Sequence, residues 1–121
     1  MTVKIPLFVK KDLYEKLKKQ VKKLDIYGLM LLSIQDHADW LVTEYTKMCM
    51  ESTKDPQEFK ECLYEVRGEV EKLLYKFIHD IYENTVMLFG VFYNYELPEN
   101  PEFNRKVEEI VQETLRRLTL S

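Results

Sequence analysis

The two histidines and the acidic residues near them come closest to the pattern of a metal site. His79 and Glu83 lie four residues apart, and Asp36, His37 and Asp39 form a second group. Helical bundles that bind iron typically carry Glu-x-x-His pairs that project inward. Neither histidine here has a glutamate three residues before it. We therefore expect no metal ion and no cofactor, and interpret both histidines as structural.

Nucleophilic catalysis and nucleotide binding have less support in the sequence than a metal site has. Ser33, Cys49 and Cys62 are not part of a recognisable nucleophile elbow. The three glycines are widely spaced, so the chain has no glycine-rich loop that could hold a phosphate. Both cysteines fall in helical patterns beside apolar neighbours, and we interpret them as small core residues, with a bridge between them as the alternative. We expect neither an enzyme nor a small-molecule substrate.

Four segments have apolar residues spaced three or four apart, which is typical of helices packed on one side. The first covers residues 12–24, where Asp12 is the predicted N-cap. The second starts either near residue 26 or near residue 34, because Ser33 and Asp36 have the spacing of a capping box.

Proline marks the starts of the other two helices. Asp55-Pro56 opens a long helix that reaches Phe92 and can bend at Gly68 or Gly90. After a loop over residues 94–100, Asn100-Pro101 opens the last helix.

Residues 2–9 alternate between apolar residues and others, with Val3, Ile5, Leu7 and Val9 on one side. A period of two predicts a strand, and Pro6 restricts it to a sheet edge. The predicted fold class is therefore mainly α: a bundle of about four helices with one short N-terminal β-strand. The chain has no internal repeat, and we expect a single domain over residues 1–121.

Charge divides the chain into two parts. Residues 1–25 contain eight lysines and three acidic residues, whereas residues 26–121 contain ten basic and eighteen acidic residues. Such asymmetry indicates that the N-terminal segment faces an anionic partner. That partner is either a nucleic acid or the acidic part of a second copy.

The N-terminal sequence VKIPLFVKKDLYEKLKKQVKKLD resembles the opening of ribbon-helix-helix DNA-binding proteins, in which a short strand is followed by a helix. In that family, strands from two subunits pair and lie in the DNA major groove. The resemblance implies that Ile5, Leu7 and Val9 face the core of a dimer and that Lys4, Pro6 and Phe8 face the bases. It also implies a nucleic-acid-binding set of lysines, namely Lys4, Lys10, Lys11, Lys16, Lys18 and Lys19.

A cluster of aromatic residues near the end of the long helix includes Phe89 and Phe92. Aromatic side chains are favoured at interfaces. We therefore expect a homodimer whose interface includes Ile5, Leu7, Val9, Phe89 and Phe92. Capping of the bundle core is the alternative role for the aromatics.

Together these features predict a non-catalytic binding protein that regulates transcription by contacting nucleic acid through a basic N-terminal ribbon and helix. The alternative is a helical structural or adaptor protein that self-assembles or binds a protein partner. We expect a cytoplasmic location, because the sequence has no secretion leader and no apolar run of about 20 residues. The excess of Lys and Glu over Gln and Asn indicates a thermophile.

Overall fold

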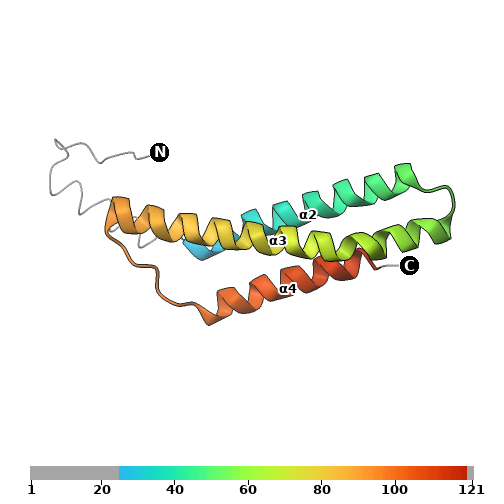
Figure 1. The fold of residues 1–121 in the computed structure, drawn as a ribbon. Helices are drawn as coiled ribbons and strands as arrows, with labels where there is room; N and C mark the ends of the chain where they lie inside the picture. The colour runs from blue at the N-terminus through green and yellow to red at the C-terminus, as the bar shows by residue number, and fades with distance from the viewer. Residues whose placement is uncertain (1–24, 120–121) are drawn as a thin grey trace.

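The computed structural model describes residues 25–119, which form three helices (Figure 1). They are α2 (Ile26–Ser52), α3 (Pro56–Tyr93) and α4 (Pro101–Arg117). The predicted mainly helical class is confirmed. The predicted strand over residues 2–9 and the predicted helix over residues 12–24 lie outside the described residues, and residues 25–119 contain no strand.

The three helices pack side by side (Figure 1). A turn over residues 53–55 joins α2 and α3 into an antiparallel hairpin, and α4 returns along it after the loop over residues 94–100. Helix α2 packs against both other helices, whereas the contact between α3 and α4 is smaller. Because α3 is 38 residues long and α2 only 27, the last turns of α3 extend past the start of α2.

Side chains cap the start of each helix, as the sequence predicts for α3 and α4. The backbone N–H of Glu58 donates to the Asp55 carboxylate at 2.9 Å, and that of Phe103 donates to the Asn100 side-chain oxygen at 3.0 Å. At the other end of α3, Asn94 adopts a left-handed conformation with φ of 47°, which ends the helix.

The start of α2 resolves the choice between residues 26 and 34. The backbone N–H of Gly28 donates to Asp25 Oδ1 at 2.8 Å, so Asp25 is the N-cap. The capping box predicted from Ser33 and Asp36 is therefore wrong: Ser33 lies inside α2, and its hydroxyl donates to the carbonyl of Leu29 at 3.1 Å. Gly28 permits the cap, because a Cβ at this position would clash with the Asp25 carboxylate.

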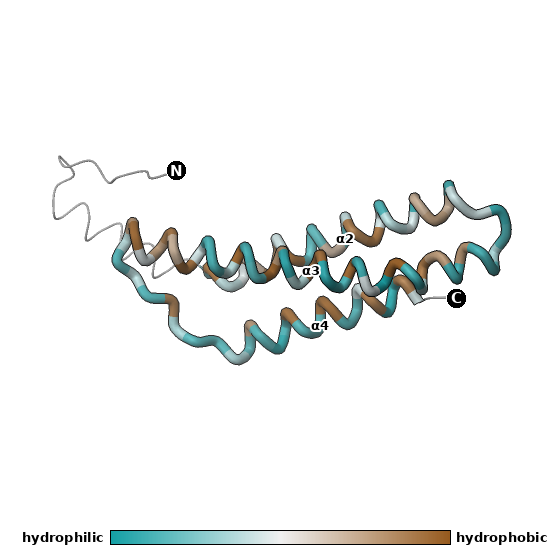
Figure 2. The backbone as a smooth tube through the Cα atoms, in the orientation of Figure 1, coloured by the Kyte–Doolittle hydropathy of each residue, from teal (hydrophilic) through white to brown (hydrophobic). Residues whose placement is uncertain are grey.

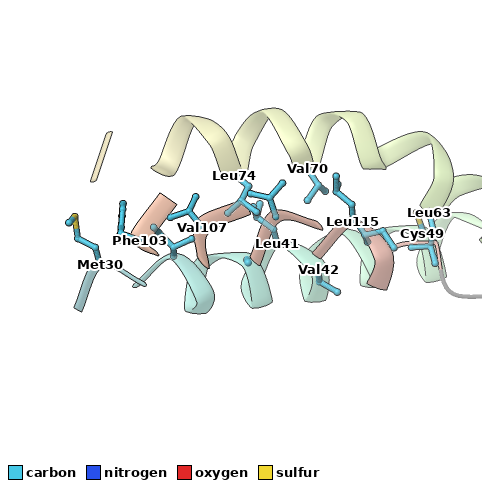
Figure 3. Close-up of a cluster of buried hydrophobic side chains, with 14 of the residues drawn as sticks. Met30, Leu41, Val42, Cys49, Leu63, Val70, Leu74, Phe103, Val107 and Leu115 are labelled. Atoms are coloured by element: carbon cyan, nitrogen blue, oxygen red, sulfur yellow. The ribbon is translucent and has the colours of Figure 1, made fainter. Parts of the chain in front are cut away.

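Buried side chains from all three helices form one core (Figure 3). Most of the fully buried residues are spaced three or four apart along their helix, and the largest are Ile34, Leu41, Val70, Leu74, Val111 and Leu118. Apolar burial at this spacing is the main stabilising term for a small helical domain. Helix α3 continues through Gly68 and Gly90, so neither glycine breaks the helix.

A disulfide joins Cys49, near the end of α2, to Cys62, near the start of α3, across a Cα–Cα distance of 5.7 Å. The interpretation of the cysteines as unlinked core residues is therefore wrong, and the alternative of a bridge is correct. Cys49 is fully buried in the core, whereas Cys62 is half-buried. The apolar surroundings predicted for Cys49 are confirmed; the antiparallel hairpin brings the two thiols together, which periodicity alone does not reveal.

Candidate functional site

Most of the predicted site residues lie outside the described residues. These are the six lysines, Lys4, Lys10, Lys11, Lys16, Lys18 and Lys19, and the interface residues Ile5, Leu7 and Val9. Phe89 and Phe92 are described, and both are half-buried in the last turns of α3. Phe89 packs against the core and against Tyr93, with ring centroids 5.4 Å apart. This packing matches the alternative role of capping the bundle core, and the dimer-interface role of Phe89 and Phe92 stays a prediction.

The two histidines have different environments. His37 is half-buried and stacks on Phe77 with ring centroids 4.1 Å apart, and it also stacks on Trp40 at 5.7 Å. Burial lowers the pKa of His37 below its usual value, because the imidazolium loses hydration there. His79 is exposed on α3. Within residues 25–119, no three His, Cys, Asp or Glu side chains lie close enough to hold a metal ion.

Polar contacts secure α4 to the other two helices. Arg117 Nη1 donates to Asp39 Oδ1 on α2 at 2.6 Å, and the Tyr75 hydroxyl on α3 donates to Glu108 Oε1 at 3.0 Å. The Arg117 hydrogen bond lowers the pKa of Asp39, whereas burial and the neighbouring Glu108 carboxylate raise the pKa of Tyr75. Tyr27 at the start of α2 donates to the carbonyl of Pro98 in the loop before α4.

The opposite flank of the α2–α3 pair carries large apolar side chains, of which four are exposed while Phe77 and Ile81 are half-buried against the core. We call these six residues the apolar strip: Leu29 and Trp40 of α2, and Leu73, Phe77, Ile81 and Leu88 of α3. Leu29 and Trp40 are each 56% exposed, and Leu88 is 47% exposed. Figure 2 shows hydrophobic residues continuing along α3 to its Tyr93 end. There, Met87 and Val91 are also exposed.

Helix geometry places the apolar strip away from α4. Tyr82 of α3 and Gln35 of α2 line depressions that α4 closes from its side. At about 100° per residue, the strip residues Leu73, Phe77 and Leu88 lie roughly 120° or more around α3 from Tyr82. Leu29 and Trp40 lie similarly far around α2 from Gln35. The α2–α3 pair therefore has one flank covered by α4 and one apolar flank that no other described helix covers.

Two adjoining depressions follow the strip. One is lined by residues of both helices, including Leu29, Ser33 and Phe89, and the other by α3 residues, including Phe77 and Leu88. Ile81 and Thr85 line both depressions, so the two are continuous along α3. The apolar strip with its depressions is the candidate binding site of the described part of the chain.

The strip was missed in the sequence because its residues belong to the same helical periodicity as the core. Phe77, Ile81 and Leu88 fit the apolar stripe of the long helix as well as buried Leu74 does. A broad apolar stripe indicates a wide contact surface. The pattern alone does not say which part of that surface a neighbouring helix covers.

Comparison with family models, with curated proteins and with solved structures finds no match to this chain. Among the described helices, none has an apolar stretch long enough to cross a membrane. Conclusions about function therefore rest on the residues of this chain itself.

Proposed function

We propose that this chain is a non-catalytic binding protein that contacts nucleic acid through its basic N-terminal segment, residues 1–25. The observation that carries the proposal is the separation of charge along the chain. Eight of the eighteen basic residues fall within the first 25 positions, where only three acidic residues accompany them. Lysines bind nucleic acid through the phosphate backbone, which makes affinity depend on their number and clustering.

The charges of the described helices favour nucleic acid binding by the N-terminal segment over binding by the bundle. Residues 26–119 have an excess of acidic residues, and arginines of α4 are already engaged with neighbouring glutamates. Arg105 pairs with Glu109, and Arg116 pairs with Glu113. A surface with this excess of negative charge repels phosphates, which favours the N-terminal segment as the place where nucleic acid binds.

We also propose an arrangement for the N-terminal residues. Residues 2–9 form a strand that pairs with its copy in a homodimer, and residues 12–24 form a fourth helix that carries the lysines. The resemblance to ribbon-helix-helix proteins supports this arrangement, because their strands pair between subunits. A cytoplasmic location in a thermophile is compatible with the Cys49–Cys62 disulfide, since intracellular proteins of hyperthermophiles are rich in disulfides.

A second candidate is a structural or adaptor protein that binds a protein partner and no nucleic acid. The exposed apolar residues at the Tyr93 end of α3, Met87, Leu88 and Val91, favour it. Contiguous exposed apolar surface often marks a protein interaction site.

Two matched variants separate the candidates. The first replaces Lys10, Lys11, Lys18 and Lys19 with Gln. The control replaces four exposed lysines of α2 and α3 with Gln, namely Lys47, Lys60, Lys72 and Lys76. Both variants lose four positive charges, so any effect of net charge alone is the same.

Binding is measured by fluorescence anisotropy with labelled duplex and single-stranded DNA and with RNA at 50 mM salt. The proposal predicts that the N-terminal variant loses more than about tenfold in affinity and that the control loses little, because phosphate contacts dominate binding. Equal losses in both variants would contradict the proposal. The adaptor function would replace it if the wild-type protein bound none of these nucleic acids.

A further inference from the structure

We infer that the apolar strip is the docking site for residues 12–24 of the same chain, which pack there as a fourth helix. The inference concerns an interaction surface within the protein and is independent of nucleic acid binding. It rests on the exposure of the strip, on the place where the described helices begin, and on the apolar pattern of the segment before them.

The dimensions of the strip and the segment match. Along α2, Leu29 and Trp40 are separated by eleven residues, or about 17 Å at 1.5 Å per residue. Along α3, Leu73 and Leu88 are separated by fifteen residues, or about 23 Å. A helix of residues 12–24 has a length of about 20 Å, so it covers the strip without extending far beyond either end.

The chain connection places the segment beside the flank of α2 that carries Leu29 and Trp40. Residue 24 immediately precedes Asp25, the N-cap of α2, and Leu29 lies about one turn further along α2. Connections of about two to five residues make two helices antiparallel neighbours, so the last residues of the segment together with Asp25 form the connection to α2. Helix α2 has α3 and α4 as neighbours already, and the flank that carries Leu29 and Trp40 is the side left for a preceding helix.

The segment has the apolar face that this flank requires. Leu13, Leu17, Val21 and Leu24 recur at intervals of three or four, so they lie on one face of a helix. Lys19 and Lys22 fall on the opposite face, pointing away from the strip if the apolar face is docked. The docked helix therefore presents these two lysines outward.

Charge favours the same contact. Asp80 lines one of the two depressions, and exposed Asp36 lies one turn before Trp40 on the flank of α2 that carries the strip. The segment has the opposite sign, since residues 12–24 contain five lysines and two acidic residues. Acidic residues at the edge of the strip attract a basic helix and discourage a second acidic bundle.

Trp40 makes the inference measurable, because it is the only tryptophan of the chain and it is 56% exposed among the described residues. Docking shields its indole from water. In the full chain we expect blue-shifted Trp40 emission and weak quenching by acrylamide. Replacing Leu17 and Val21 with Gln removes the apolar contacts, and we expect a red shift with a severalfold rise in the quenching constant.

The matched control replaces Lys19 and Lys22 with Gln on the opposite face of the segment, and we expect it to keep the shielding of the wild type. Circular dichroism checks that both variants retain α2, α3 and α4. Hydroxyl-radical footprinting of the wild-type chain provides a measurement without substitutions. Relative to the unfolded chain, docking predicts strong protection of Trp40 and little protection of Tyr64, which is 68% exposed on α3.

Three results would overturn the inference. The first is equal accessibility of Trp40 to acrylamide in the full wild-type chain and in the unfolded chain. The second is shielding that survives the Leu17 and Val21 substitutions. The third is shielding lost on dilution together with a halved mass in light scattering, which would assign the strip to a second copy.

Discussion

Reduction of the Cys49–Cys62 disulfide should destabilise the bundle strongly. The bond closes a loop with a sequence separation of 13 residues, which contains the turn between α2 and α3. Cross-linking a loop of this length lowers the entropy of the unfolded chain, and the loop-closure relation gives about 3 kcal/mol at 25 °C. Typical domains unfold at a cost of only about 5–15 kcal/mol, so this is a large share.

The expected change in melting temperature follows from that free energy. For a domain of this size, 3 kcal/mol corresponds to a decrease of roughly 10 °C. Reduction changes few contacts in the core, because Cys49 stays fully buried as a thiol and packs as a small apolar residue. The loss of stability therefore measures the effect of closing the loop and not the creation of a cavity.

The assay is thermal and urea unfolding monitored by circular dichroism, with and without a non-thiol reductant. Alkylation and mass spectrometry establish the redox state of each sample. The control variant replaces both cysteines with Ala; it should unfold near the temperature of the reduced wild type and should not respond to reductant. The reasoning is refuted if oxidised and reduced wild type melt within about 1 °C of each other.

Four further predictions use single substitutions. Gly68→Ala should raise the unfolding free energy by about 0.5–1 kcal/mol in urea titrations, because its Cβ enters open space in a helix interior. Gly28→Ala should lower it by about 1 kcal/mol, because the Cβ displaces the Asp25 cap; the opposite order would contradict the cap geometry. Leu74→Ala should cost about 2–5 kcal/mol, since Leu74 is fully buried, and a smaller loss would argue against this core. As pH falls through about 6.5, the unfolded chain protonates His37 before the folded chain does. Wild-type stability should therefore decline over this interval more than that of His37→Gln, and parallel melting curves would exclude the lowered pKa.

Local chemistry explains which parts of the fold were predictable. Asp55-Pro56 and Asn100-Pro101 combine a capping side chain with a proline that needs no hydrogen-bond partner, so they fix two helix starts without tertiary information. The start of α2 was ambiguous because Asp25 and Ser33 both offer a side-chain oxygen. Packing of Ile26 and Met30 into the core decides between them.

Contacts between distant residues explain the rest. The bridge between Cys49 and Cys62 depends on the antiparallel register of α2 and α3. The stacking of His37 on Phe77 depends on the same register and brings together residues forty positions apart. Leu29 and Leu88 are exposed because α4 packs on the other flank of the α2–α3 pair. None of these features leaves a periodic signal in the sequence.

The salt dependence of nucleic acid binding by the wild-type chain tests the proposed function most directly. If the six N-terminal lysines each contact a phosphate, the affinity for duplex DNA should fall about 10³-fold between 50 and 200 mM salt, with a log–log slope near −5. Replacing Lys10, Lys11, Lys18 and Lys19 with Gln should reduce that slope by about 3–4. Undetectable binding at 50 mM salt, or a slope unchanged by these substitutions, would contradict the assignment of nucleic acid binding to the N-terminal segment.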